Sequence, residues 1–159
     1  MNQNFPYPIE EKWMQKALEE AQSAFDIHEV PIGAVIIHNN EVIASAHNQV
    51  ESAQDASCHA ELQCLRAAAA KLGRWRLNDC VLYCTFEPCI MCYGAMVHFR
   101  LGGLVFGAPD LRHGALGSLY DLSLRKHPIH QVPFVSGCLK ESCKEIVQRF
   151  FRLRREENK

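Results

Sequence analysis

Apolar residues recur at intervals of three and four positions between about Ile9 and Phe25, which predicts an amphipathic helix. A β-branched run follows from Gly33 to Ile37, and Asn39-Asn40 separates it from a second run, Glu41 to Ser45. Asparagine tolerates the backbone conformations of tight turns, so these two runs are predicted to pair as a β-hairpin. The chain therefore begins with a predicted helix followed by two strands.

The middle of the chain alternates between polar and apolar stretches. Residues 48–58 are polar and predict a loop. Between Leu62 and Leu72 the apolar positions share one helix face, and Gly73 can end that helix in the left-handed conformation. Cys80 to Thr85 is predicted to be a strand, and it is too uniformly apolar to have a face in water.

The last third of the chain continues the alternation. Cys89 to Phe99 is predicted to be a helix that is apolar on most sides and therefore buried. A fourth strand is predicted from Gly103 to Gly107, followed by a glycine-containing loop from Ala108 to Ser118. Val132 to Ser136 predicts a fifth strand, and Lys140 to about Arg154 predicts a closing helix.

Strands that alternate with helices predict an α/β fold with three layers (α/β/α), in which helices flank a mixed five-stranded sheet. The chain has 159 residues and 48% hydrophobic content, which suits a folded domain with a sizeable core. No linker, repeat or low-complexity segment divides it, so we expect a single domain over residues 1–159. The formal net charge of −1 indicates neither nucleic acid nor membrane as a partner.

Eight cysteines would suit disulfides in a secreted chain. The N-terminal stretch, however, carries prolines and glutamates where a signal peptide would be apolar, and no span reaches membrane length. We therefore expect a cytoplasmic protein with reduced thiols. Most of the cysteines are then interpreted as small core residues, namely Cys64, Cys80, Cys84, Cys138 and Cys143. Cys58 stays open because it adjoins a histidine.

The segment Glu87-Pro88-Cys89-Ile90-Met91-Cys92 carries the first chemical signal. Two cysteines at this spacing can bind one metal from the first turn of a helix, and a proline suits a helix start. His59 adds a nitrogen ligand, which makes three protein ligands. A structural zinc site uses four ligands, whereas a catalytic site leaves one position for water, so the set predicts a catalytic Zn²⁺. Glu61 is then placed to move protons.

Two simpler interpretations compete with a catalytic zinc site. A Cys-x-x-Cys pair can be a thioredoxin-like redox pair, but His59 and Glu61 argue against that function. A structural zinc ribbon needs a second Cys-x-x-Cys, which the sequence lacks. Taken alone, Glu61 would be an ordinary acidic residue in a first helical turn.

If both metal-binding segments begin helices, two helix N-termini point at one place and favour the thiolate form of the cysteines. Two thiolates and a neutral imidazole balance the charge of Zn²⁺. A zinc-bound water has its pKa lowered from 15.7 towards about 7. Glu61 would take that proton, pass it to a ring nitrogen as hydroxide attacks the amine-bearing carbon, and protonate the departing ammonia. This role requires that Glu61 is not itself a ligand.

The sequence resembles the bacterial tRNA adenosine deaminases, which have a cytidine deaminase-like fold, over nearly its whole length. The pair of motifs His-x-Glu and Pro-Cys-x-x-Cys is shared with cytidine, cytosine and guanine deaminases, so it identifies only the superfamily. The segments that indicate tRNA are the loop from Ala108 to Ser118 and the C-terminal tail, Phe150 to Arg155. The segments that carry the resemblance are Glu29–Val35, His59–Glu61, Leu82–Met96, Val105–Ala108 with Gly114–Ser118, and Phe150–Arg155.

The resemblance implies a homodimer that converts the wobble adenosine of a tRNA anticodon, in bacteria that of an arginine tRNA, to inosine. It implies one zinc per chain and an anticodon stem-loop as partner. Asn48 would hydrogen-bond the flipped base with help from the Ala60 backbone N–H, although Asn48 could equally be a turn residue. The remaining residues expected to bind substrate are Glu87, Pro88, Ala108, Asp110, Phe151, Arg152 and Arg154.

The sequence departs from the family pattern at three places. Ala56-Ser57-Cys58 precedes the histidine where Pro-Thr-Ala is common, and Pro109 stands where a basic residue is frequent. Arg112 and His113 stand where Lys and Thr are common, which could restore positive charge. These changes concern RNA affinity more than chemistry.

Helical geometry separates two sides of the C-terminal tail. Its apolar side should dock on the core through Ile146, Val147, Phe150 and Leu153. Arginines gather elsewhere, namely Arg149, Arg152 and Arg155, with Arg154 at the end of the apolar side. This cluster is either a solvated charged end or a contact to anticodon phosphates and bases.

Two rival functions stay open. A free-base or nucleoside deaminase for guanine or cytosine would share the zinc motif but has no need of an arginine-rich tail. A zinc-containing RNA-binding module without catalysis would have no use for the carboxylate of Glu61.

Overall fold

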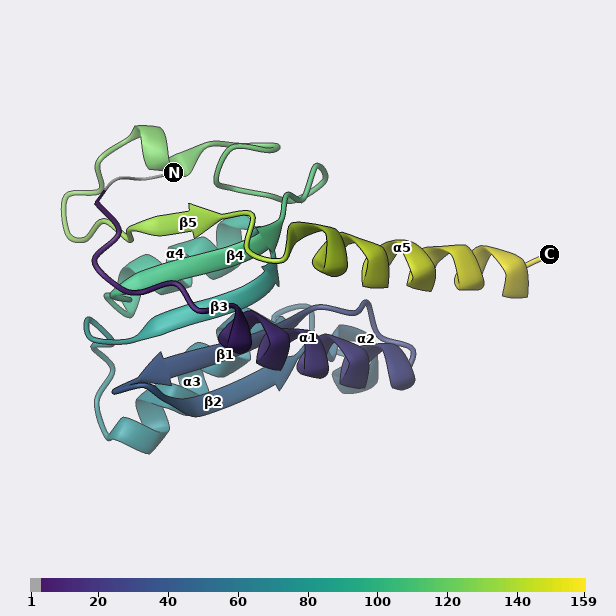
Figure 1. Ribbon diagram of the computed structural model, residues 1–159, viewed down its shortest axis with the longest axis horizontal. Coiled ribbons are helices and arrows are strands. Elements are labelled where there is room, and N and C mark those ends of the chain that lie inside the picture. Colours follow the sequence, from purple (N-terminus) through teal and green to yellow (C-terminus); the bar gives the residue numbers. More distant parts are fainter. Residues whose placement is uncertain (1–3) are drawn as a thin grey trace.

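The computed structural model describes residues 4–159, whose five strands form one sheet in the order β2-β1-β3-β4-β5 (Figure 1). β1 pairs antiparallel with β2 and β3, whereas β3, β4 and β5 run parallel. The sheet is therefore mixed, as predicted. The strand bounds are β1 Gly33–His38, β2 Glu41–His47, β3 Val81–Phe86, β4 Gly103–Ala108 and β5 Phe134–Ser136.

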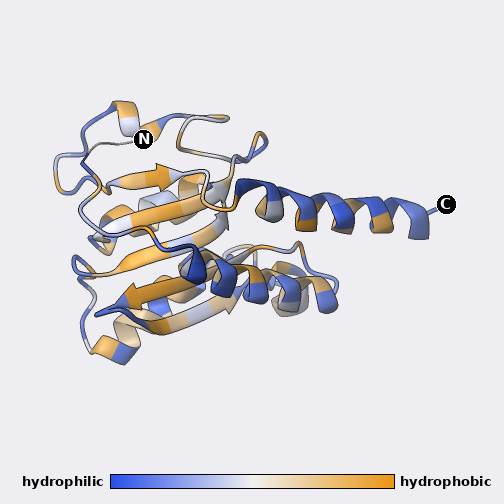
Figure 2. Ribbon diagram, viewed as in Figure 1, coloured by the Kyte–Doolittle hydropathy of each residue, from blue (hydrophilic) through white to orange (hydrophobic). Residues whose placement is uncertain are grey.

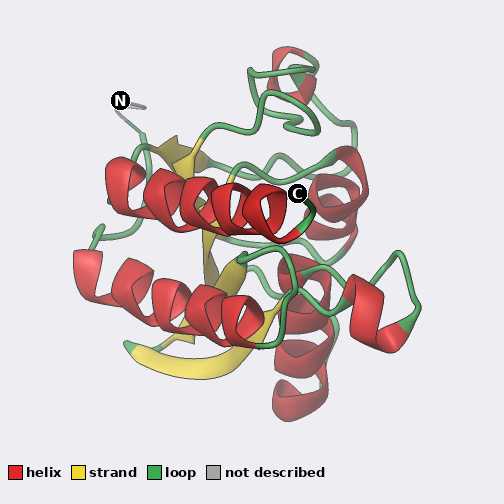
Figure 3. Ribbon diagram, turned by 90° about the vertical axis from the view of Figure 1, so that its right-hand side faces the viewer, coloured by secondary structure: helices red, strands yellow, loops and turns green. Residues whose placement is uncertain are grey.

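Helices cover both faces of this sheet, which Figure 3 shows from the side. α1 and α5 pack against one face and against each other, while α3 packs on the opposite face beside α4. The three-layer α/β/α architecture predicted from the sequence is confirmed. The helix bounds are α1 Glu11–Asp26, α2 Val50–Ala53, α3 Ala60–Leu72, α4 Ile90–His98 and α5 Lys140–Glu157, with a short 3₁₀ helix at Leu122–Leu124.

The core has two parts, one on each face of the sheet, and the strands that supply both are strongly apolar (Figure 2). Alternate residues of β3 enter the two parts, with Leu82 on the α3 side and Tyr83 on the α1 side. Five of the six β3 residues are buried, which confirms a strand without a face in water. In residues 4–159 no helix is both long and apolar enough to cross a membrane.

The local predictions hold where nearby residues decide the conformation. Asn39 and Asn40 have φ angles of 50° and 60° and close the β1–β2 hairpin. Gly73 follows α3 with φ 65°, the left-handed conformation that ends a helix. Residues 109–118 lie outside helices and strands, as predicted, while Ala108, predicted to begin this loop, is the last residue of β4. An isolated bridge joins Cys89 and Gly114.

Two predictions about secondary structure and burial are wrong. Residues 48–58 are not all loop, because α2 forms within them and the buried Glu29 carboxylate accepts its first backbone N–H groups. α4 is not buried on most sides: Ile90 and Met91 are 48% and 38% exposed. Its inner face packs on the core while its outer apolar face lies at the surface.

The sheet topology brings the chemically interesting segments to one edge. β2, β3 and β4 run in the same direction, so their carboxyl ends lie together. Asn48 follows β2, Glu87 follows β3, and the loop from Pro109 follows β4. This edge is where α3 and α4 begin.

Candidate metal centre and active-site pocket

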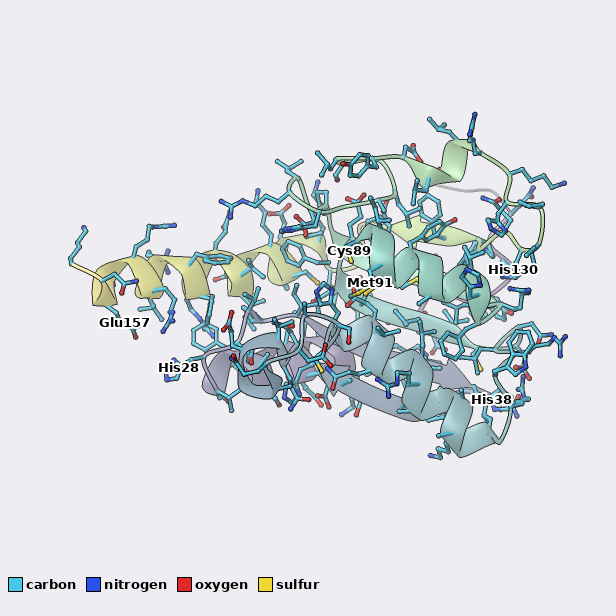
Figure 4. The ribbon with its side chains drawn as sticks, turned by 180° about the vertical axis from the view of Figure 1, so that it is seen from behind. His28, His38, Cys89, Met91, His130 and Glu157 are labelled. Atoms are coloured by element: carbon cyan, nitrogen blue, oxygen red, sulfur yellow. The ribbon has the colours of Figure 1, made fainter. Side chains whose placement is uncertain are left out.

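Three side chains that could hold a metal ion meet at the starts of α3 and α4. His59 is the residue before α3 and Cys89 the residue before α4, while Cys92 lies in the first turn of α4. The His59 Nδ1 atom is 3.6 Å from both cysteine sulfurs, and all three donor atoms lie within 4.8 Å of one another. Figure 4 shows Cys89 near the middle of the view, with Met91 beside it and His38 away at the lower right.

The protonation of this cluster follows from its contacts. A hydrogen bond from Cys92 lowers the pKa of Cys89 to about 4, so the half-buried Cys89 is a thiolate. The hydrogen bond to Cys89 raises the pKa of His59 above its ordinary value. The hydrogen bond with Cys89, together with burial, raises the pKa of Cys92, so the two sulfurs differ and the imidazole lies beside the anionic one.

The donor set fits a zinc ion. Two thiolates and one imidazole are the soft and borderline donors that Zn²⁺ prefers, and two helix N-termini favour the anionic sulfurs. With three protein donors, a tetrahedral ion keeps one position for another ligand. In the described chain Cys58 is not part of the three-atom cluster. Its thiol has a raised pKa through partial desolvation and the nearby Asp55, so it is a poor ligand candidate.

Glu61 lies beside the cluster without belonging to it. It is the second residue of α3 and only 4% exposed, and its carboxylate is not among the three donors that lie within 4.8 Å of one another. Burial raises the pKa of Glu61 to about 7, although a hydrogen bond from its own backbone N–H and the nearby His59 oppose the shift. A carboxyl group with such a pKa can both accept and release a proton near neutral pH.

A cavity of about 710 Å³ opens above these residues. This volume lies in the range of small-molecule sites in proteins. Its floor holds His59, Glu61 and Cys89, and its sides come from three other places in the chain. These are the stretch between Glu29 and Glu51, the loop after β4, and the middle of α5.

Asn48 has a fixed orientation on the pocket wall. Its Nδ2 atom donates to the Glu29 carboxylate and to the Val30 carbonyl, each at 3.4 Å. Glu29 is 1% exposed, and it also accepts the backbone N–H groups of Glu51 and Ser52 at 3.3 and 2.6 Å. Because the amide nitrogen is engaged, the carbonyl oxygen of Asn48 is the atom left for a ligand.

Comparison with known proteins agrees with this geometry. A profile of the MafB19-like deaminase family matches residues 9–155. The tRNA-specific adenosine deaminase of Bacillus subtilis (strain 168) is 43% identical over 150 residues, which are 94% of this chain and 93% of the relative. The protein of the same name from Streptococcus pyogenes serotype M1 is 39% identical over 156 residues, 97% and 91% of the two chains. The chain belongs to the tRNA-specific adenosine deaminase family.

Solved structures place this deaminase in the same fold. A structure from a study of A-to-I editing by tRNA:A34 deaminases is similar with a TM-score of 0.82 and 36% identity, covering 86% of this chain and 99% of the other. Guanine deaminase from Bacillus subtilis is more distant, with a TM-score of 0.62 and 27% identity over 91% and 95% of the two chains. The cytidine deaminase-like architecture expected from the resemblance is confirmed.

The pocket of this deaminase contains several of the residues expected to bind substrate. Asn48, Ala60, Asp110 and Phe151 all line it, and Phe151 is 37% exposed. Ala60 is the first residue of α3, where a helix leaves its backbone N–H free. Asp110 accepts N–H groups within its own loop, so its side chain shapes the turn at the pocket wall.

Other expected residues lie outside the pocket lining. Pro88 and Ala108 are buried, and their carbonyl groups accept N–H groups from Ala115 and Glu87. Glu87 touches the pocket, but its carboxylate binds the loop after β4.

The C-terminal arginines lie further along α5. Arg152 and Arg154 are exposed on the part of the helix that extends beyond the sheet (Figure 1). Phe150 is buried, but Leu153 is 41% exposed, so the apolar side of α5 leaves the core before the helix ends. Arg149 differs from these two arginines because α1 holds its side chain: its guanidinium donates a hydrogen bond to Gln22 at 2.9 Å.

Three further residues of the pocket were not predicted from the sequence. Glu29 orients Asn48, and Leu111 and Val147 supply apolar wall. For Glu29 the available signal was a carboxylate four residues ahead of a strand whose residues are mostly apolar. Leu111 and Val147 carry no such signal, because only the fold brings them together.

Proposed function

We propose that this chain hydrolyses the wobble adenosine of a tRNA anticodon to inosine, with an arginine tRNA as substrate. The observation that carries the proposal is the His59–Cys89–Cys92 cluster with the buried Glu61 beside it, at the base of a cavity of about 710 Å³. Such a cavity suits a single base extruded from an RNA loop. The family membership and the A-to-I editing studied in the structural relative support adenosine as that base.

The proposed cofactor is one Zn²⁺ per chain, held by His59, Cys89 and Cys92. When bound, zinc supplies Lewis-acid activation of water. Glu61 is the proton carrier: its carboxylate takes a proton from the attacking water and gives it to a ring nitrogen of the base. It then takes the remaining hydroxyl proton and delivers it to the amino group, which leaves as ammonia while the carbonyl forms. Burial of Glu61 keeps both protonation states accessible near neutral pH.

Asn48 and Ala60 are proposed to hold the base over this centre. Glu29 and the Val30 carbonyl engage the amide nitrogen of Asn48, so its carbonyl oxygen accepts a hydrogen bond from the nucleoside. The free N–H at the start of α3 donates to the base from the other side. A nucleoside that satisfies both groups is held with its amine-bearing carbon near Glu61.

RNA outside the base is proposed to contact the loop after β4 and the C-terminal helix. Arg112 and His113 are exposed on that loop, and Phe151 lines the cavity from α5. Arg152 and Arg154 lie one to three residues further along, beyond the body of the protein. Exposed arginines next to an aromatic ring suit the phosphates and bases of a single-stranded loop.

We also propose a cytoplasmic homodimer of single-domain chains. The exposed apolar face of α4, Ile90 and Met91, gives a surface that a second copy could cover. Leu122, in the short 3₁₀ helix, is 38% exposed. It lines a shallow hollow together with Tyr93 and Gly94 of α4. The single sheet and the family match over residues 9–155 support one domain.

The test is incubation of the protein with total bacterial tRNA, followed by mapping of inosine. Inosine at the wobble position of an arginine tRNA is expected, and the Glu61→Gln variant serves as the control without proton transfer. Turnover of isolated guanine with no inosine in tRNA would instead identify a guanine deaminase and refute the proposal.

A further inference from the structure

Glu87 has an unusual environment for a residue at the edge of a pocket. It is 3% exposed and lies between the end of β3 and the metal ligand Cys89. Its Oε1 atom accepts the backbone N–H groups of Leu116 and Ser118 at 2.8 and 3.1 Å. Its Oε2 atom accepts the Asp110 N–H at 3.1 Å and the Ser118 hydroxyl. Both oxygens therefore bind the loop that follows β4.

These four hydrogen bonds use the whole acceptor capacity of the carboxylate. Two oxygens offer about four lone-pair positions, and the loop fills two on each oxygen. The sequence-based expectation that Glu87 binds substrate would require the carboxylate to give up one of these bonds. Glu87 is better placed to act through the loop than on a ligand.

The backbone joins the same two segments. The Glu87 N–H donates to Ala108 at 2.8 Å, and the Ala115 N–H donates to Pro88 at 2.9 Å. The close approach also explains Gly114, since a Cβ atom there would lie 2.4 Å from the Glu87 carboxyl carbon. The loop between Ala108 and Ser118 is thus fastened at its start, middle and end to the turn that carries Cys89.

This loop forms one side of the cavity. Pro109, Asp110, Leu111, Arg112 and His113 all line it, and none of them is part of a helix or strand. Its shape therefore depends on its attachments, and the Glu87 carboxylate supplies several of them.

We propose that Glu87 is a positioning residue, which holds the loop from Ala108 to Ser118 in the conformation that binds RNA and makes no contact with the reacting base. The proposal rests on the proposed function for its effect on RNA. Its structural part, the carboxylate fastening the loop, can be measured separately. Loss of the carboxylate should loosen one wall of the cavity and leave the metal cluster in place.

Glu87→Gln is the sharpest variant because it keeps size while replacing one acceptor oxygen with an NH₂ donor. Glutamine keeps one acceptor oxygen, so either the Asp110 amide hydrogen or those of Leu116 and Ser118 lose their acceptor and should exchange about 10-fold faster or more, as measured by NMR. Ala115 gives the background rate within the same loop, because its acceptor is the Pro88 carbonyl. Glu29→Gln is the matched control: it alters an equally buried carboxylate across the cavity and should leave these exchange rates unchanged.

With an anticodon stem-loop RNA as substrate, Glu87→Gln should raise KM about 10-fold while kcat changes by less than ~3-fold, because a positioned binding surface is lost and not a chemical group. Zinc content should match that of the wild-type protein. Unchanged exchange at Asp110, Leu116 and Ser118 alike, or a loss of kcat at unchanged KM, would overturn the proposal. Loss of zinc would also overturn it.

A milder variant keeps the test decisive if Glu87→Gln does not fold. Ser118→Ala removes the hydroxyl donor alone, and it should raise KM in the same direction by a smaller factor. A KM equal to that of the wild-type protein would count against Glu87 as the loop anchor. If the wild-type protein does not deaminate tRNA, the proposed function fails, whereas the exchange result still decides whether Glu87 fastens the loop.

Discussion

The arginines of α5 differ in their surroundings, and this allows a prediction about RNA binding. Arg149 donates to Gln22 and lies 4.5 Å from the ring centre of Phe25, so α1 holds it in place. Arg152 and Arg155 are exposed, and Arg154 makes an exposed ion pair with Glu157 at 3.3 Å. We predict that changing Arg152, Arg154 and Arg155 together to alanine weakens the binding of an anticodon stem-loop and reduces its salt dependence.

The magnitude follows from counterion release. Each phosphate contact on a single strand contributes about −0.7 to the slope of log affinity against log salt, so three contacts contribute about −2. Arg154 must give up its pair with Glu157, but an exposed pair is worth only about 0–1 kcal/mol, so the exchange is feasible. If Arg154 keeps its pair, two contacts contribute about −1.4. With a slope difference of about 2, raising the salt from about 50 to about 200 mM weakens the RNA affinity of the wild-type protein by a factor roughly 20-fold larger than that of the variant.

The assay is fluorescence anisotropy of a labelled anticodon stem-loop at several potassium chloride concentrations. The triple variant should bind more weakly at low salt and show a slope flatter by about 1.4–2. Arg149→Ala is the matched control, because its guanidinium is engaged by α1, and it should keep the wild-type slope. Zinc content and thermal unfolding verify that the variants are folded. A triple variant with the slope and affinity of the wild-type protein would show that the tail is ordinary solvated surface.

Three further predictions concern the metal, the proton carrier and the dimer. Metal analysis should show about one equivalent of zinc per chain in the wild-type protein. Cys89→Ala and Cys92→Ala should each lose most of it, whereas Cys58→Ser should keep it. A Cys58→Ser protein with little zinc would mean that the ligand set is misassigned. Glu61→Gln should retain zinc and RNA binding but deaminate about 10²–10⁴-fold more slowly, and near-normal turnover would remove Glu61 from the mechanism. Leu122→Glu places a charge on the proposed dimer surface, so sedimentation should shift from dimer to monomer at unchanged zinc content; a wild-type protein that sediments as a monomer contradicts the dimer.

Much of this fold is predictable because short stretches of sequence determine it. The alternation of strands and helices gave the architecture, and Asn39-Asn40 gave the hairpin through local turn chemistry. The metal cluster was equally accessible. The spacing of Cys89 and Cys92 fixes two donors on one helical turn, and the structure brings His59 within 3.6 Å of both sulfurs.

The features that escaped prediction all depend on contacts distant in sequence. α2 has no capping side chain of its own, and Glu29, more than twenty positions away, accepts its N–H groups. Glu87 could be recognised as part of the zinc motif, but its partners lie 23 to 31 residues later. The exposed side of α4 has the same origin, since Ile90 and Met91 are apolar like the buried residues beside them. Composition alone does not show which face of a helix the core covers.

The two hydrophobic clusters on the faces of the sheet have a consequence for how the protein acquires its cofactor. They draw side chains from α1, α3, α4 and the strands. Of the three proposed ligands, only Cys92 belongs to a cluster, whereas Cys89 is packed against that cluster and His59 belongs to neither. A domain held together in this way folds through its core, unlike small zinc domains that are unfolded without metal. Zinc would then enter a scaffold that is already complete. Its supply in the cell would set the active fraction of the protein without changing the amount of folded chain.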